Sequence, residues 1–192
     1  MPAFVSGFEW DVFISYSHAD DVVMAGLDSG WVHTFTNNLQ RLLYQRLGKT
    51  GRGSIWIDPR LSGNEPFDEK IGAAVSNTAT LLVILSQEGY LKSGWCRRER
   101  ELFLQAARRS GGHKGRIFAI RLNDINHRDL PPELERQLGY DFFKKDGEQS
   151  EARILGFPFP NPRDPADRAY FLRLDDVARE LGDRLKDMAS TR

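Results

Sequence analysis

The sequence has little of several features that mark common protein classes. A single cysteine among 192 residues excludes an intrachain disulfide and a cysteine zinc site, and it is typical of a reducing compartment. The longest purely aliphatic run spans only residues 81–85, and the first ten residues hold no basic stretch followed by an apolar one. We therefore expect a cytoplasmic protein without a membrane segment. Lysine plus arginine and aspartate plus glutamate both number 27, so no overall positive field exists to attract a nucleic acid.

Motifs that hold nucleotides or metals in other folds are also missing. No G-x-x-x-x-G-K-[ST] occurs, and the one G-x-G, at residues 51–53, precedes a predicted strand instead of joining a strand to a helix. The histidines at positions 18, 33, 113 and 127 lack the spacing of metal ligands. A phosphate-accepting receiver domain would need an acidic residue after its third strand, where this chain has Ser86. We therefore expect no bound cofactor and no metal ion.

The apolar residues form short, nearly continuous runs with helical patterns between them. Continuous runs are typical of strands that are covered on both faces. Strands that alternate with helices run parallel, because each crossover packs its helix back onto the sheet. The sequence therefore predicts an α/β fold, a three-layer sandwich around a parallel sheet. The expected strands lie at residues 12–14, 55–57, 81–85 and 117–120, and the expected helices at 31–47, 67–75 and 95–109.

The C-terminal part of the chain has a weaker pattern. Residues 140–143 favour a fifth strand at an edge of the sheet, and residues 147–165, rich in glycine, proline and polar residues, favour a connector. A final helix is expected, with Asp164 as its N-cap and a proline in its first turn. We divide the chain into a domain at 1–146 and an appended connector and amphipathic helix at 147–192, which either docks on the domain or leads elsewhere. The apolar stripe of this helix consists of Phe171, Leu174, Val177, Leu181, Leu185 and Met188.

Polar side chains follow each of the four predicted strands. Ligands of open parallel sheets bind beyond the carboxyl ends of the strands, so these residues are the first candidates for a site. Loops are polar in any case because they are solvated, and for each residue alone this is the stronger explanation. The four segments are residues 15–18, 58–60, 86–88 and 123–124.

Glu99 is a sharper signal, because it lies on the apolar side of its predicted helix. At roughly 100° per residue it falls within the apolar stripe, whereas Glu101 falls among the solvated residues. A carboxylate on a buried stripe is costly unless it is paired, hydrogen-bonded or used in chemistry. A salt bridge to Arg60, Arg98 or another cation and a functional role are equally open. Cys96, at the border of the stripe, has no base beside it and is expected to pack rather than react.

Four longer motifs occur along the first two thirds of the chain. They are DVFISYS at 11–17, IDPRLSGNEPF at 57–67, LVILS at 82–86 and YLKSGWCRRE at 90–99. In this order and spacing, which cover about residues 9–123, they resemble the Toll/interleukin-1 receptor (TIR) domains, and the bacterial members most closely. The resemblance implies a flavodoxin-like sheet with the strand order 2-1-3-4-5.

Two functions are implied by the resemblance. Many bacterial and plant TIR domains cleave the nicotinamide–ribose bond of NAD+, giving nicotinamide and ADP-ribose or a cyclic isomer, whereas animal receptor and adaptor members mainly assemble signalling complexes. The glutamate of the W-x-x-x-E motif, here Glu99 after Trp95, would be the catalytic carboxylate. Tyr16, Ser17, Arg60 and Trp95 would contact NAD+, which would be a substrate and not a cofactor. We therefore expect an NAD+ nucleosidase, with a non-catalytic protein-interaction module as the alternative.

The resemblance also implies activation by self-assembly. In the family, the loop after the second strand packs on a neighbouring TIR domain and helps to complete the cleft. Here that loop is about residues 59–66, and Arg60, Asn64 and Glu65 are its candidate contact residues. We expect other TIR domains as partners, no nucleic acid and no membrane, in prokaryotic immune or virulence signalling.

Overall fold

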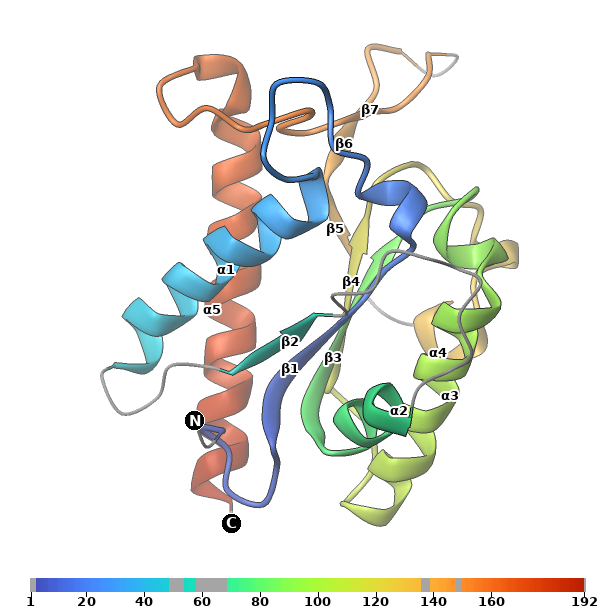
Figure 1. Ribbon diagram of the computed structural model, residues 1–192, viewed down its shortest axis with the longest axis vertical. Coiled ribbons are helices and arrows are strands. Elements are labelled where there is room, and N and C mark those ends of the chain that lie inside the picture. The colour runs from blue at the N-terminus through green and yellow to red at the C-terminus, as the bar shows by residue number, and fades with distance from the viewer. Residues whose placement is uncertain (1–2, 49–53, 58–68, 136–138, 148–149, 192) are drawn as a thin grey trace.

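A parallel five-stranded sheet forms the centre of the molecule, in the order β2-β1-β3-β4-β5 (Figure 1). The computed structural model describes residues 3–48, 54–57, 69–135, 139–147 and 150–191. The predicted fold class and strand order are confirmed. The strands of this sheet are β1 (Trp10–Ser15), β2 (Ile55–Ile57), β3 (Thr78–Leu85), β4 (Ile117–Arg121) and β5 (Tyr140–Asp141), and the helices are α1 (Trp31–Leu47), α2 (Glu69–Ser76), α3 (Gly94–Arg109), α4 (Pro132–Glu135) and α5 (Arg168–Ser190).

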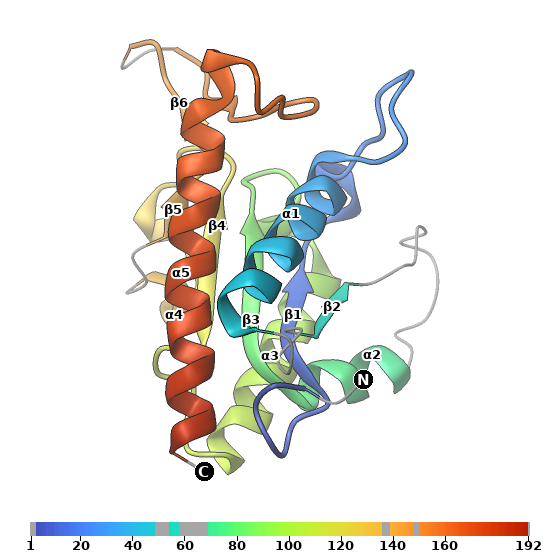
Figure 2. The same cartoon turned by 90° about the vertical axis from the view of Figure 1, so that its left-hand side faces the viewer.

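Helices cover both faces of the sheet, which makes three layers. Figure 1 shows α2, α3 and α4 on one face, and Figure 2 shows α1 and α5 side by side on the other. Side chains alternate along a strand, so β1 contributes to the hydrophobic cores on both faces of the sheet. Phe13 belongs to the core under α2 and α3, whereas Val12 and Ile14 belong to the core under α1 and α5. Every residue of β3 is buried, as expected for a central strand covered on both sides.

Asp11 anchors the start of the sheet. Its side chain is fully buried, and its carboxylate accepts hydrogen bonds from the backbone N–H groups of Phe4 (2.9 Å), Val5 (3.0 Å) and Ser54 (2.7 Å). A buried carboxylate is tolerated only when it is hydrogen-bonded in this way. The aspartate that opens the DVFISYS motif therefore joins the N-terminal segment, β1 and the entry to β2.

The C-terminal helix is part of the core that also contains α1. Asp164 accepts a hydrogen bond from the N–H of Ala166 (2.9 Å), which caps a single 3-10 turn at Pro165–Asp167, and α5 begins directly after that turn. An exposed ion pair joins Arg46 of α1 to Asp175 of α5 (2.6 Å). Of the predicted apolar stripe, the members that are fully packed in this core are Leu174, Val177, Leu181 and Leu185, and those that are partly buried against it are Phe171 and Met188.

The segment predicted as one edge strand is divided between two sheets. Only Tyr140–Asp141 pairs with β4, whereas β6 (Phe143–Lys144) pairs antiparallel with β7 (Arg153–Ile154). Phe142, which separates β5 from β6, donates its N–H to the carbonyl of Arg121 and accepts the N–H of Leu155. Its fully buried ring packs edge-on against the aromatic residues of α1 and α5, namely Trp31, Phe35 and Tyr170. Phe142 therefore lies between the two sheets and is hydrogen-bonded on both sides.

Among the described helices, none is both long and apolar enough to cross a membrane.

Candidate functional site

The candidate site lies where β1 and β3 end and α3 begins. Ser93 is the N-cap of α3, and its hydroxyl oxygen accepts a hydrogen bond from the N–H of Cys96 (3.3 Å). This cap fixes the first turns of α3 beside the carboxyl end of β1. Trp95, which is partly exposed, and Glu99 follow one helical turn apart.

Glu99 faces the sheet. Its side chain is only 6% exposed, and the hydroxyl of Ser15, the last residue of β1, donates a hydrogen bond to Oε2 at 2.5 Å. The expectation that Glu99 lies on the buried side of the helix is confirmed, and Glu101 is exposed as expected. A short hydrogen bond to a carboxylate is stronger than one between neutral groups, so Ser15 holds this acid against the strand end.

Two further buried groups surround this carboxylate. Tyr90, in the 3-10 turn Tyr90–Lys92, is 1% exposed, and its hydroxyl oxygen lies 3.4 Å from Oγ of Ser15. Burial raises the pKa of the Tyr90 hydroxyl, which therefore keeps its proton at neutral pH. Burial, and next the charge of Glu99, raise the pKa of the Cys96 thiol to about 12. Since the thiolate is the reactive form, Cys96 packs and does not act as a nucleophile at neutral pH.

Asp20 is a second, partly buried carboxylate at this edge of the sheet. The hydroxyl of Ser86, directly after β3, donates a hydrogen bond to Asp20 Oδ2 at 2.6 Å. Burial raises the pKa of Asp20 to about 6, although the Ser86 hydrogen bond acts in the opposite direction. Oγ of Ser86 also accepts the N–H of Tyr90 (2.9 Å). Asp20 and Ser86 can lie this close to residue 89 because it is a glycine: a Cβ there would lie 2.6 Å from both Asp20 Oδ2 and Ser86 Oγ.

The comparison with known proteins identifies the family. A family model described as TIR domain matches residues 12–155, which is well over half of the chain. The chain belongs to the TIR domain family. The matched segment contains Ser15, Asp20, Tyr90 and Glu99, so the carboxyl edge described above is an edge of a TIR domain.

A solved structure with a TM-score of 0.50 agrees at the level of the fold. A metazoan TIR-STING receptor from C. gigas, in complex with 2',3'-cGAMP, is 14% identical with a TM-score of 0.50, and the match covers 95% of this chain. This chain spans only 42% of the length of that receptor chain. The TIR domains of the activated Roq1 resistosome, which directly recognises the pathogen effector XopQ, are also 14% identical, with a TM-score of 0.41 and coverage of 94% of this chain and 84% of theirs. No curated protein is similar enough in sequence to count as a relative.

The structure does not bring every candidate residue of this TIR domain to Glu99. Tyr16 is buried in the core on the α1 side, where its ring lies 5.3 Å from that of His18 and 6.0 Å from that of His33. Ser15, one residue earlier, meets Glu99 on the α3 side instead. Ser17 is the N-cap of the 3-10 turn His18–Asp20 and is partly exposed. The substrate contacts of Tyr16, Ser17 and Trp95 remain predictions.

Other candidates fall outside the described residues. The predicted assembly loop at residues 59–66 belongs there, together with Arg60, Asn64 and Glu65. The salt bridge from Glu99 to Arg60 that the sequence left open is therefore not described either. Within the described ranges, no group of three or more histidine, cysteine, aspartate or glutamate side chains is placed to hold a metal ion.

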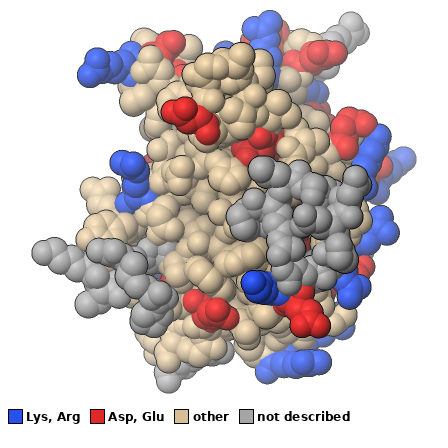
Figure 3. Space-filling view, viewed as in Figure 1, with Lys and Arg blue, Asp and Glu red and all other residues tan. Residues whose placement is uncertain are grey.

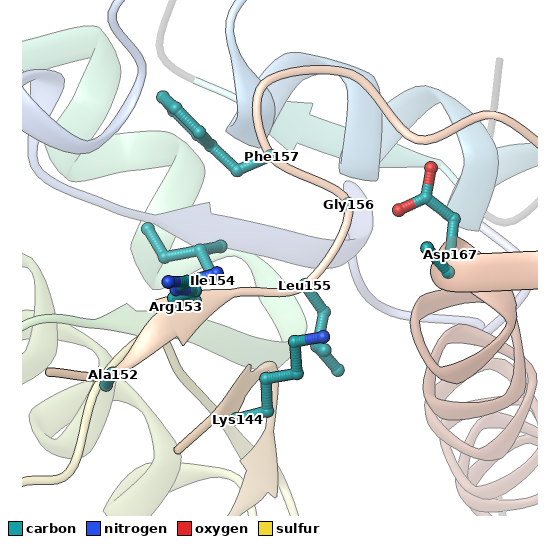
Figure 4. A pocket seen from close by; sticks show the side chains of 9 residues that line it. Lys144, Ala152, Arg153, Ile154, Leu155, Gly156, Phe157 and Asp167 are labelled. Carbon is teal, nitrogen blue, oxygen red and sulfur yellow. The ribbon is translucent and has the colours of Figure 1, made fainter. Parts of the chain in front are cut away.

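A pocket of about 450 Å³ lies away from Glu99, between the β6–β7 hairpin and the start of α5 (Figure 4). Leu155 and Gly156 line it together with Lys144 and Asp167, and none of the residues that the sequence singled out takes part. On the face seen in Figure 3, basic and acidic side chains are interspersed. The pocket and the surface charges therefore add no residue to the candidate site.

Proposed function

We propose that this TIR domain cleaves the nicotinamide–ribose bond of NAD+ and releases nicotinamide together with ADP-ribose or a cyclic isomer. The observation that carries this proposal is the position of Glu99. It is a carboxylate held by Ser15 at the carboxyl end of a parallel strand, within the W-x-x-x-E motif of a TIR domain. That edge is where open α/β sheets bind their ligands.

The reaction needs little beyond a well-placed negative charge. Nicotinamide in NAD+ is cationic, so it leaves with the bonding electrons as a neutral molecule and requires no protonating acid. The ribosyl group left behind has the character of an oxocarbenium ion, as in glycoside hydrolysis. Glu99, which is 6% exposed, would stabilise this cation in surroundings where water screens the charge poorly. Attack by water gives ADP-ribose, and attack by another atom of the same product gives the cyclic isomer.

The substrate contacts and the assembly state are parts of the same proposal. Trp95, at the start of α3, would stack on a ring of NAD+, and Arg60 would bind its phosphates. Head-to-tail association through the loop at residues 59–66 would complete the cleft, and such open contacts produce filaments instead of closed rings. The setting would be the cytoplasm of a prokaryote, in immune or virulence signalling. A rate of NAD+ cleavage per subunit that stays constant over a wide dilution series would contradict activation by assembly.

The test compares two glutamates of the same helix. Concentrated protein is incubated with NAD+, and nicotinamide release is measured for the wild type, Glu99→Gln and Glu101→Gln. Glu99→Gln keeps the shape of the side chain but removes its charge, and we expect a loss of about 100-fold or more. Glu101 is exposed, and we expect its variant to cleave NAD+ at the wild-type rate.

Two results would contradict parts of this proposal. Equal nicotinamide release from the wild type and Glu99→Gln would remove Glu99 from the mechanism. No release from the wild type, even when concentrated or crowded, would favour the alternative function, a TIR domain that only binds protein partners.

A further inference from the structure

We propose that Ser15 and Tyr90 are positioning residues for the Glu99 carboxylate: Ser15 holds it in its working orientation by a buried hydrogen bond, and the Tyr90 hydroxyl supports Ser15 from the other side. The inference rests on the proposed function, since it concerns the residue proposed to act on NAD+. The three side chains come from the end of β1, the 3-10 turn after β3, and α3. Their meeting fixes the carboxylate relative to the sheet and not only relative to its own helix.

The single proton of the Ser15 hydroxyl decides which of its two contacts is the hydrogen bond. A serine hydroxyl has one proton, and the 2.5 Å contact between Ser15 Oγ and Glu99 Oε2 uses it. In the 3.4 Å contact between Ser15 Oγ and the Tyr90 hydroxyl oxygen, Ser15 is again the donor, so this longer and weaker contact competes for the same proton. Burial raises the pKa of Tyr90, so its proton is present at neutral pH. The Ser15 proton is therefore directed to Glu99, and the Tyr90 hydroxyl lies beside this hydrogen bond.

The burial of Ser15 and Tyr90 indicates that they position Glu99 and do not contact the substrate themselves. Ser15 is fully buried and Tyr90 is 1% exposed, so neither side chain can contact a substrate without a rearrangement of the core. Their effect on the reaction must pass through Glu99. A glutamate side chain turns about three bonds, and a displacement of about 1 Å at a reacting group can cost about 100-fold in rate. Fixing Oε2 removes much of that freedom.

Several contacts fix the position of Tyr90. Its N–H donates to Oγ of Ser86, and the Ser86 hydroxyl donates to Asp20. The guanidinium of Arg100 lies 5.9 Å from the centre of the Tyr90 ring, and Arg100 forms an ion pair with Glu133 of α4. The position of the Tyr90 hydroxyl is thus set by the loops after β1 and β3 together with α3 and α4.

Hydroxyl deletions test the positioning roles of Ser15 and Tyr90. Initial rates of nicotinamide release against NAD+ concentration give kcat and KM for Ser15→Ala, Tyr90→Phe and Ser15→Thr. We expect Ser15→Ala to lower kcat by about 10- to 100-fold, with KM changed by less than about threefold, and Tyr90→Phe to lower kcat less. Ser15→Thr keeps the donor, and we expect its kcat to lie closer to that of the wild type than the kcat of Ser15→Ala does.

Thr36→Val is the matched control. The Thr36 hydroxyl is buried too, but among the described residues its hydrogen bond goes to the carbonyl of Val32 in its own helix, so we expect wild-type kcat and KM from this variant. Circular dichroism at the assay temperature confirms that each variant is folded. A folded Ser15→Ala variant with wild-type kcat, beside an inactive Glu99→Gln, would overturn the positioning role while the proposed function stands. Absence of nicotinamide release from the wild type would overturn both.

Discussion

Replacing Leu181 by alanine tests whether α5 belongs to the cooperative core of the domain. Leu181 is fully buried at the face of α5 that meets α1. The two helices approach closely there, since a Cβ added at Gly182 would lie 3.7 Å from Arg46 and 3.9 Å from Leu43 of α1. Truncating a buried leucine removes its transfer free energy and leaves a cavity, which together cost about 2–5 kcal/mol. For a chain of this size, about 3 kcal/mol corresponds to a fall in Tm of roughly 6–12 °C.

The matched control is Leu172→Ala in the same helix. Leu172 is 58% exposed, so its truncation should change Tm by no more than about 1–2 °C. Thermal and urea unfolding, followed by circular dichroism, measure both variants beside the wild type. If Leu181→Ala shifts Tm as little as Leu172→Ala does, or if α5 unfolds in a separate transition, then residues 147–192 are an appendage whose packing adds nothing to the stability of the domain.

Three further predictions concern other parts of the structure. Because the pKa of Asp20 rises from 3.8 to about 6 on folding, the folded state binds this proton more tightly, and the free energy of unfolding should fall as pH rises from about 4 to about 6. Asp20→Asn should lose this dependence, and its free energy of unfolding at pH 7, measured in urea, should exceed that of the wild type by on the order of 1–3 kcal/mol. An unchanged pH dependence of the free energy of unfolding would contradict this prediction. Gly156→Ala should lower Tm by several degrees, since Gly156 has φ of 68° and its Cβ would lie 2.8 Å from the Tyr170 ring, whereas Gly147→Ala, with nothing within 4 Å, should not. Cys96, the single cysteine, should react with a thiol reagent only after denaturation, and rapid labelling of the native protein would refute its burial.

The sheet and α1 could be predicted because their signals are local. The helix expected at 31–47 has those bounds. Its apolar residues recur at helical spacing and define one face without reference to the rest of the chain, namely Val32, Phe35, Leu39, Leu42, Leu43 and Leu47. The strand expected at 140–143 was partly wrong for the opposite reason. Its apolar composition is right for a strand, but residues 143–144 pair with β7 instead of β4, and Phe142, between the two pairings, packs against aromatic rings from α1 and α5. Contacts between segments that are far apart in sequence leave no periodic pattern.

The residues of the candidate site also divide into those with a local sequence signal and those without one. Glu99 could be found because the angle between positions on a helix follows from their spacing alone, and its buried placement is confirmed. Ser15 and Tyr90 could not be assigned to it, because their meeting requires the packing of α3 on the end of β1. One signal was nevertheless present: Ser15 is two residues from Phe13 and therefore shares its face, whereas Tyr16 shares the face of Ile14. Once α3 is known to cover the Phe13 face, alternation along the strand selects Ser15 as the neighbour of the carboxylate. Whether a side chain at the end of a strand faces a given helix therefore depends on whether its position in the strand is odd or even. Tyr16 lies on the other face from Ser15, so it can reach a substrate bound at Glu99 only around the end of β1.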